Sequence, residues 1–192
     1  MGRNPFALPT GTLGRFAGWV MSRDDRPHRE AAGLLDPAPG TTVCEIGFGP
    51  GQFLAVLAER DSSLHLCGAD PSEVMLTQAR AAAPGADLRR GTADELPFYD
   101  DSAEHVAAIN NVALWPDRPV GLAEAHRVLR PGGTLLLAWH SSAAPSPVRR
   151  AMAKPDPWWE ALLAEVRAEF GNAERHDLRH LTACTATDAS TA

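Results

Sequence analysis

A glycine-rich turn is the stretch of the chain that says most about chemistry. The residues read Val43-Cys44-Glu45-Ile46-Gly47-Phe48-Gly49-Pro50-Gly51, which predicts a strand, then a turn of spaced glycines, then a helix. Glycines lack a Cβ, so charged ligand atoms can approach the bare backbone, and the N-terminus of the following helix offers unpaired N–H groups. The dinucleotide fingerprint places its third glycine at position 52, which is Gln52 here, so the turn disfavours a nicotinamide cofactor.

A carboxylate, Asp70, follows the next predicted strand and lies 19 residues beyond Gly51. At this place a carboxylate can accept hydrogen bonds from both hydroxyls of a ribose. The alternative is that Asp70 caps the helix that begins after Pro71, and the two roles are compatible. We therefore expect Asp70 to bind a nucleoside, with helix capping left open.

Four motifs in register resemble the class I S-adenosylmethionine-dependent methyltransferases, in particular the compact group whose first motif is Glu-x-Gly-x-Gly-x-Gly. Besides the glycine turn, three further stretches match the order and spacing of this family. They are Gly68-Ala69-Asp70-Pro71-Ser72, Gly91-Thr92-Ala93-Asp94-Glu95-Leu96-Pro97-Phe98 and Glu124-Ala125-His126-Arg127-Val128-Leu129-Arg130-Pro131-Gly132-Gly133. The resemblance covers about residues 40 to 140.

The resemblance implies S-adenosylmethionine as the cofactor and methyl transfer as the reaction. It also implies which residues contact each part of the cofactor. These are Glu45, Gly47, Gly49 and Gly51 around the methionine moiety and sulfonium, Asp70 with Pro71 at the ribose, Ala93 and Asp94 at the adenine edge, and Asn110 at the methionine amino group. The segment from Arg127 to Gly133 is expected to be structural.

Departures from related families narrow the acceptor. After the fourth predicted strand the residues are Asn110-Asn111-Val112-Ala113, not the Asp/Asn-Pro-Pro-aromatic motif that marks methylation of nucleobase amino groups. A Pro-Cys nucleophile for cytosine C5 chemistry is also missing. The fifth predicted strand ends in Trp139-His140-Ser141, without the acidic pair of metal-dependent catechol methyltransferases. We therefore expect a small-molecule acceptor with an O, N or C nucleophile, and no metal.

The histidines can be sorted by position, because open α/β sheets bind ligands outside the carboxyl ends of their strands. His140 ends the fifth predicted strand, and an imidazole with a pKa of about 6.5 can accept a proton near neutral pH. His140 is thus the candidate general base, and a loop histidine bonded to backbone is the alternative. We expect His28, Asn111 and Trp115 to line the substrate pocket.

The elements that position these residues alternate between strand and helix patterns. We predict strands at residues 42–46, 64–69, 86–90, 105–110, 134–139, 173–178 and 181–187. Such alternation predicts a Rossmann-like, doubly wound α/β fold: a mostly parallel seven-stranded sheet with helices on both faces and one antiparallel strand near the C-terminus. Residues 1–36 are expected to form an N-terminal helical lid with helices at 13–20 and 27–35, and residues 37–192 the cofactor-binding domain.

Composition limits the partners. The 192 residues carry a net charge of −6 and no basic block longer than a pair, so nucleic acid is not an expected partner. No apolar run approaches the roughly 20 residues needed to span a bilayer, and we expect a soluble, cytoplasmic protein. Two alternatives stay open: a protein that uses S-adenosylmethionine structurally or for cyclisation or regulation, and an NAD(P)-dependent oxidoreductase, which Gln52 disfavours.

Overall fold

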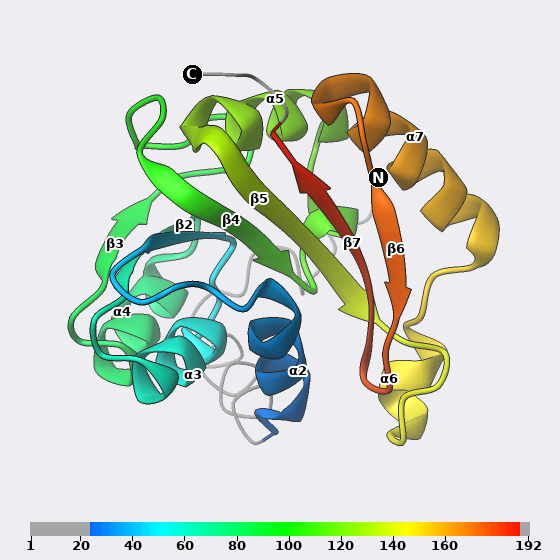
Figure 1. The fold of residues 1–192 in the computed structure, drawn as a ribbon. Helices are drawn as coiled ribbons and strands as arrows, with labels where there is room; N and C mark the ends of the chain where they lie inside the picture. The colour runs from blue at the N-terminus through cyan, green and yellow to red at the C-terminus, as the bar shows by residue number, and fades with distance from the viewer. Residues whose placement is uncertain (1–23, 189–192) are drawn as a thin grey trace.

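A seven-stranded sheet in the order β3-β2-β1-β4-β5-β7-β6 runs through the computed structural model, which describes residues 24–188 (Figure 1). Its strands are β1 (Thr42–Ile46), β2 (His65–Asp70), β3 (Asp87–Arg90), β4 (Ala103–Ile109), β5 (Leu129–His140), β6 (Glu174–Asp177) and β7 (Leu181–Thr187). Strands β1 to β5 pair in parallel, while β7 runs antiparallel to both β5 and β6. The predicted fold class, with its single antiparallel strand near the C-terminus, is confirmed.

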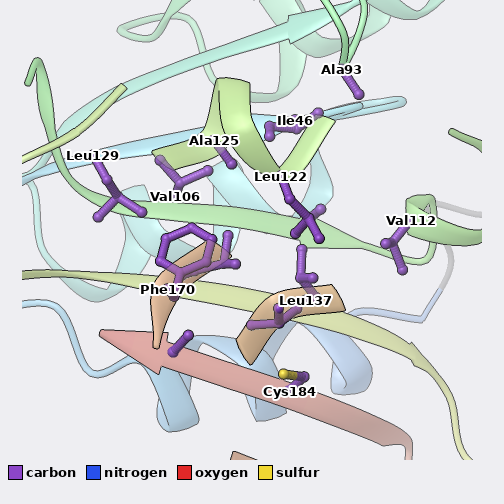
Figure 2. Packing of buried hydrophobic residues seen from close by; sticks show 14 of the residues in the cluster. Ile46, Ala93, Val106, Val112, Leu122, Ala125, Leu129, Leu137, Phe170 and Cys184 are labelled. Carbon is purple, nitrogen blue, oxygen red and sulfur yellow. The ribbon is translucent and has the colours of Figure 1, made fainter. Parts of the chain in front are cut away.

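Helices cover both faces of this sheet (Figure 1). They are α2 (Arg26–Leu35), α3 (Gln52–Arg60), α4 (Glu73–Ala82), α5 (Arg118–Val128), α6 (Pro147–Ala151) and α7 (Asp156–Phe170), with a 3-10 turn at Val112–Leu114. Buried side chains of α2, α3 and α4 pack on one face, and those of α5 and α7 pack on the other. Figure 2 shows the second of these layers, in which Leu122 of α5 and Phe170 of α7 lie near Val106 and Leu137 of the sheet.

Strand β5 shows how the pleat assigns side chains to the two faces. Leu135, Leu137 and Trp139 belong to the cluster formed with α5 and α7, whereas Leu136 and Ala138 belong to the cluster formed with α2 and α3. Successive side chains of a strand point to opposite faces. His140 therefore falls on the face that α2 and α3 cover.

The strand order reverses between β1 and β4, which are neighbours in the sheet although two helices and two strands separate them in the chain. The chain leads from β1 toward β2 and from β4 toward β5, so the loops after β1 and β4 run in opposite directions across the sheet. A crevice opens between these loops, beyond the carboxyl ends of the strands. We call the edge at which β1 to β5 end the carboxyl edge. The fold therefore directs a ligand to the carboxyl edge between β1 and β4.

Two elements differ from the sequence prediction. Strand β5 begins at Leu129, so the Pro131-Gly132-Gly133 turn lies inside it, and the register with β4 shifts there. A short helix, α6, forms where no element is predicted from the sequence, because Pro147 starts it and the Ser146 hydroxyl accepts a hydrogen bond from Arg149 N.

The predicted N-terminal lid falls only partly on the described residues. The helix expected at 13–20 lies outside them. Helix α2 packs Ala31, Ala32 and Leu35 into the core against α3 and the sheet, so this part also serves the hydrophobic core. Among residues 24–188, no helix is long and apolar enough to cross a membrane.

Candidate active site at the carboxyl edge

The turn after β1 is built from three glycines in left-handed conformations. Gly47, Gly49 and Gly51 have φ values of 67°, 52° and 83°, a region that is costly for residues with a Cβ. A Cβ on Gly49 would meet nothing within 4 Å, whereas one on Gly51 would lie 2.9 Å from the Cα and Cβ of Ala79 in α4. Gly49 therefore leaves open space for a ligand, and Gly51 is needed to let α4 approach the turn.

Asp70, at the end of β2, ties this turn to the helix that follows it. Its Oδ2 accepts a hydrogen bond from Gly49 N at 2.9 Å and its Oδ1 accepts one from Ser72 N at 2.8 Å. Burial raises the pKa of Asp70, while these two N–H groups act in the opposite direction. The N-cap of α4 is Ser72 and not Asp70, and each carboxylate oxygen of Asp70 keeps a second lone pair for a ligand.

Buried polar atoms without hydrogen-bond partners locate the site more precisely than the glycine turn and Asp70 do. Among the described residues, five buried side-chain nitrogen or oxygen atoms have no hydrogen-bond partner: His28 Nδ1, Glu45 Oε2, His105 Nδ1, Asn110 Oδ1 and His140 Nδ1. Glu45 lies one residue before the end of β1, Asn110 directly follows β4, and His140 ends β5. Only His105, near the start of β4, belongs to the opposite edge of the sheet.

The sheet brings three of these groups to one place. Glu45 lies opposite Ala107 in β4, and Asn110 N donates a hydrogen bond to Ala138 O, two residues before His140. Val43 and Ala107 belong to the cluster under α2 and α3, so the alternation along β1 puts Glu45 on that same face. Glu45 and His140 therefore share one face of the sheet at its carboxyl edge, with Asn110 beside them.

Glu45 is the most unusual of these groups because it is only 2% exposed. Burial raises the pKa of its carboxyl group well above the ordinary range, and the negative charge of Asp70 adds to the effect. A cationic ligand beside Glu45 would reverse this shift. The site is therefore electrostatically suited to a positively charged group.

The residue after Asn110 has a structural role that the sequence did not predict. The Asn111 Nδ2 donates to Ile46 O at 2.7 Å and Gly47 O at 3.1 Å, and its Oδ1 accepts from Trp115 Nε1 at 2.8 Å. These bonds tie the end of β4 to the end of β1. The amide of Asn111 thus holds the two strand ends together, and its predicted contact with substrate stays a prediction.

Trp115 is likewise committed to the protein. Besides the bond from its indole nitrogen to Asn111, its ring packs against Gly121 of α5, where a Cβ would come within 2.5 Å of ring atom Cε3. The ring also packs against the core cluster under α5 and α7. The ring is half-buried, and the predicted place of Trp115 in the substrate pocket stays a prediction.

His140 and His28 come together where α2 passes the end of β5. Burial lowers the pKa of each imidazole to about 4, with the positive charge of Arg149 as the next cause. His28 also contributes to lowering the pKa of His140, as expected for close neighbours. The sequence placed His28 in the pocket and His140 at the strand end, but Arg149 was not among the predicted site residues.

The adenine-edge segment is held by an arginine. Arg127 donates to Phe98 O at 2.8 Å and to Leu96 O at 3.1 Å, and it pairs with Glu124, which confirms its expected structural role. Within this segment Ala93 is buried in the core, whereas Asp94 is exposed. Pro71, which directly follows β2, is half-buried. Among residues 24–188, no three His, Cys, Asp or Glu side chains gather in a metal-binding cluster.

Several known proteins that resemble this chain are named as methyltransferases. Residues 44–137 match the family model described as "Methyltransferase domain". The uncharacterized methyltransferase YdaC of Bacillus subtilis is 31% identical over 121 residues, which are 62% of this chain and 67% of YdaC. Trans-aconitate 2-methyltransferase of an Azoarcus species is 34% identical over 148 residues, which are 75% of this chain and 57% of that protein.

A solved structure extends the likeness to the fold. A SAM-dependent methyltransferase from Aquifex aeolicus has a TM-score of 0.70 at 13% identity, covering 90% of this chain and 97% of the other. At this identity the likeness concerns the fold alone; the family follows from YdaC, and the matched model agrees with it. This chain belongs to the class I S-adenosylmethionine-dependent methyltransferases.

Proposed function

We propose that the protein transfers the methyl group of S-adenosylmethionine to an O, N or C nucleophile of a small molecule. One observation carries this proposal: buried atoms of His28, Glu45, Asn110 and His140 that have no partner in the described part of the chain gather at the carboxyl edge, where the fold directs a ligand. Leaving such atoms without a partner costs about 1–3 kcal/mol each. A bound cofactor and acceptor would supply the missing partners.

The residues present fit the cofactor. Its methionine end carries an ammonium and a sulfonium, and the unpartnered oxygens of Glu45 and Asn110 are acceptors suited to positive charge. Asp70 is proposed to accept hydrogen bonds from the ribose hydroxyls, and Gly49 leaves room for the ribose beside Asp70. Pro71, Ala93 and Asp94 complete the proposed set at the ribose and the adenine edge, and Gly47 and Gly51 shape the turn.

When bound, the cofactor supplies a methyl group that its sulfonium has already activated. The chain therefore has mainly to orient the acceptor in line with it, and orientation can contribute about 7–11 kcal/mol. With a pKa of about 4, His140 is neutral at pH 7 but is a weak base. We propose that His140 binds the acceptor's reacting group, and that it removes a proton only from nucleophiles that must be deprotonated.

The small-molecule acceptor is supported by a relative. The Azoarcus protein is named for methylation of trans-aconitate, and its match extends over 75% of this chain, beyond the family model. In the described chain, β5 and α7 are separated by 15 residues that include only the short helix α6. This connection is too short to hold an additional domain that would dock a macromolecule.

The proposed function is tested by incubating the protein with S-adenosylmethionine and a panel of small acids, phenols, alcohols and amines. We expect S-adenosylhomocysteine to accumulate only when a suitable acceptor is present. Binding of the cofactor without S-adenosylhomocysteine from any acceptor would instead favour a structural or non-methylating use of the cofactor.

A further inference from the structure

The imidazole pair of His28 and His140 is a built feature of the site. Both Nδ1 atoms are buried and have no partner among the described residues. His28 is in the first turn of α2, and His140 is the last residue of β5 on the face that α2 covers. Two imidazoles that need a hydrogen-bond partner are thus presented together beside Asn110.

Arg149 adds a positive charge to this pair. Its Nη1 donates to Asp24 Oδ2 at 2.7 Å, which links α6 to the residues just before α2, and its side chain is only 18% exposed. Of the charged groups that act on the two imidazoles, Arg149 has the largest effect on both pKa values. Its Nε and Nη2 make no hydrogen bond within residues 24–188, so they can bind a ligand.

The acidic residues near the pair are already occupied. Asp24 is bonded to Arg26 as well as to Arg149, and Asp25 is bonded to Arg29. Arg29 also pairs with Glu59, so the three arginines face three carboxylates in all. The excess positive charge is local to Asp24, which Arg26 and Arg149 share.

The other charged groups of this region are also engaged. The Glu30 carboxylate of α2 accepts bonds from the backbone N–H groups of Arg179, His180 and Leu181. The Arg150 guanidinium binds the carbonyls of Ala144 and Pro145. The unused capacity of the region is therefore cationic and hydrogen-bond donating.

This chemistry matches a carboxylate. A guanidinium binds carboxylates through strong, charge-assisted hydrogen bonds, and neutral imidazoles in the Nδ1–H tautomer donate further ones. A carboxylate is ionised at neutral pH, so it needs no base to become a nucleophile. Alcohols, phenols and ammonium groups do need one, and His140 is poorly suited to that task.

We propose that the acceptor is a small carboxylic acid, held by Arg149, His28 and His140 and methylated on a carboxylate oxygen. This inference rests on the proposed function. A carboxylate oxygen forms the new bond to the methyl carbon while the bond from that carbon to sulfur breaks, and the electron pair of the broken bond stays on sulfur. The products are a neutral methyl ester and S-adenosylhomocysteine, and no proton is released.

The first test uses S-adenosylmethionine labelled in its methyl group and a panel of mono-, di- and tricarboxylic acids, with the matching amides and alcohols. We expect label to enter carboxylic acids only and to be released as methanol by mild alkali, as esters require. We also expect the rate to change little between pH 6 and 9. Alkali-stable product on nitrogen, carbon or an ether oxygen would overturn the inference while leaving the proposed function intact.

The second test separates binding by Arg149 from its ion pair with Asp24. Arg149→Gln is expected to raise the acceptor KM at least tenfold and to leave the Kd for S-adenosylmethionine within about twofold of wild type. Arg150→Gln, the matched control, should leave both unchanged. Asp24→Asn removes the same ion pair but keeps the guanidinium, so the acceptor KM should stay the same or fall.

The histidines are tested by conservative replacement. His140→Gln keeps an N–H donor and should retain more activity than His140→Leu, with the loss in acceptor KM and not in cofactor affinity. Equal losses in Asp24→Asn and Arg149→Gln would make Arg149 structural and overturn the inference. So would cofactor binding with no carboxylic acid methylated, whereas failure to bind S-adenosylmethionine would overturn the proposed function itself.

Discussion

At the scale of single residues, Glu45 is the hardest side chain to explain without a ligand. It is buried, its Oε2 has no partner within residues 24–188, and burial raises its pKa well above the ordinary range. A lone buried carboxyl group destabilises a fold unless something binds it. A cationic group bound beside Glu45 would stabilise the ionised carboxylate and explain its burial.

Replacing Glu45 by Gln should weaken S-adenosylmethionine binding about 10- to 100-fold, because a hydrogen bond to a charged group is worth about 1.5–3 kcal/mol. The free energy of unfolding should not fall, since the variant no longer buries an ionisable group. Titration calorimetry and urea unfolding measure the two effects. Glu160→Gln on the exposed side of α7 is the control, and equal cofactor affinity in both variants would remove Glu45 from the site.

The limits of sequence reading are also visible at this scale. The positions of Glu45, Asp70, Asn110 and His140 follow from which strand each residue ends, and the sequence shows that. The role of Asn111 does not, because its amide binds carbonyls of residues more than 60 positions away in the chain. Only the three-dimensional pairing of β1 and β4 reveals this role.

At the scale of elements, the alternation of strands and helices was predictable because the central strands β1, β4 and β5 contain short apolar runs. The start of β5 and helix α6 were not predictable from this periodicity. Leu129 pairs with Ala103 across a register shift, although the next residues are Arg130 and a Pro-Gly-Gly turn, which signals a break. Helix α6 has no buried residue, so it leaves no hydrophobic pattern in the sequence.

The two glycines of the turn should respond differently to alanine. Both substitutions strain a left-handed backbone by about 1–2 kcal/mol, but only Gly51→Ala also forces a Cβ against Ala79 of α4 at 2.9 Å. We expect Gly51→Ala to lower the thermal midpoint more than Gly49→Ala. Gly49→Ala should mainly weaken cofactor binding, because its Cβ projects into open space. The reverse order in thermal unfolding would show that the packing of α4 on the turn is misassigned.

At the scale of the whole molecule, His126 links parts of the chain that the sheet does not join. Its Nδ1 lies 2.8 Å from Glu169 Oε1 in α7, and its Nε2 lies 3.2 Å from Asp188 Oδ1 after β7. Burial lowers the pKa of His126, but the hydrogen bonds and charges of the two carboxylates outweigh it, so the pKa is raised above 6.5. The charged imidazolium therefore favours the folded state.

The raised pKa of His126 determines how the free energy of unfolding changes with pH. The stabilisation from His126 is complete below its unfolded pKa of about 6.5 and is lost as the pH rises through the folded pKa. Urea unfolding of wild type and His126→Gln should differ more at pH 6 than at pH 9. The exposed His65→Gln variant should show no such trend, and a gap for His126→Gln that widens toward pH 9 would rule out this charged link.

The central claim is that the carboxyl edge between β1 and β4 binds S-adenosylmethionine. The most direct measurement is a calorimetric titration of the purified protein with S-adenosylmethionine, S-adenosylhomocysteine and NADH. The structure predicts that the first two bind at one site and that NADH does not bind. Binding of NADH alone, or of none of the three, would contradict the account.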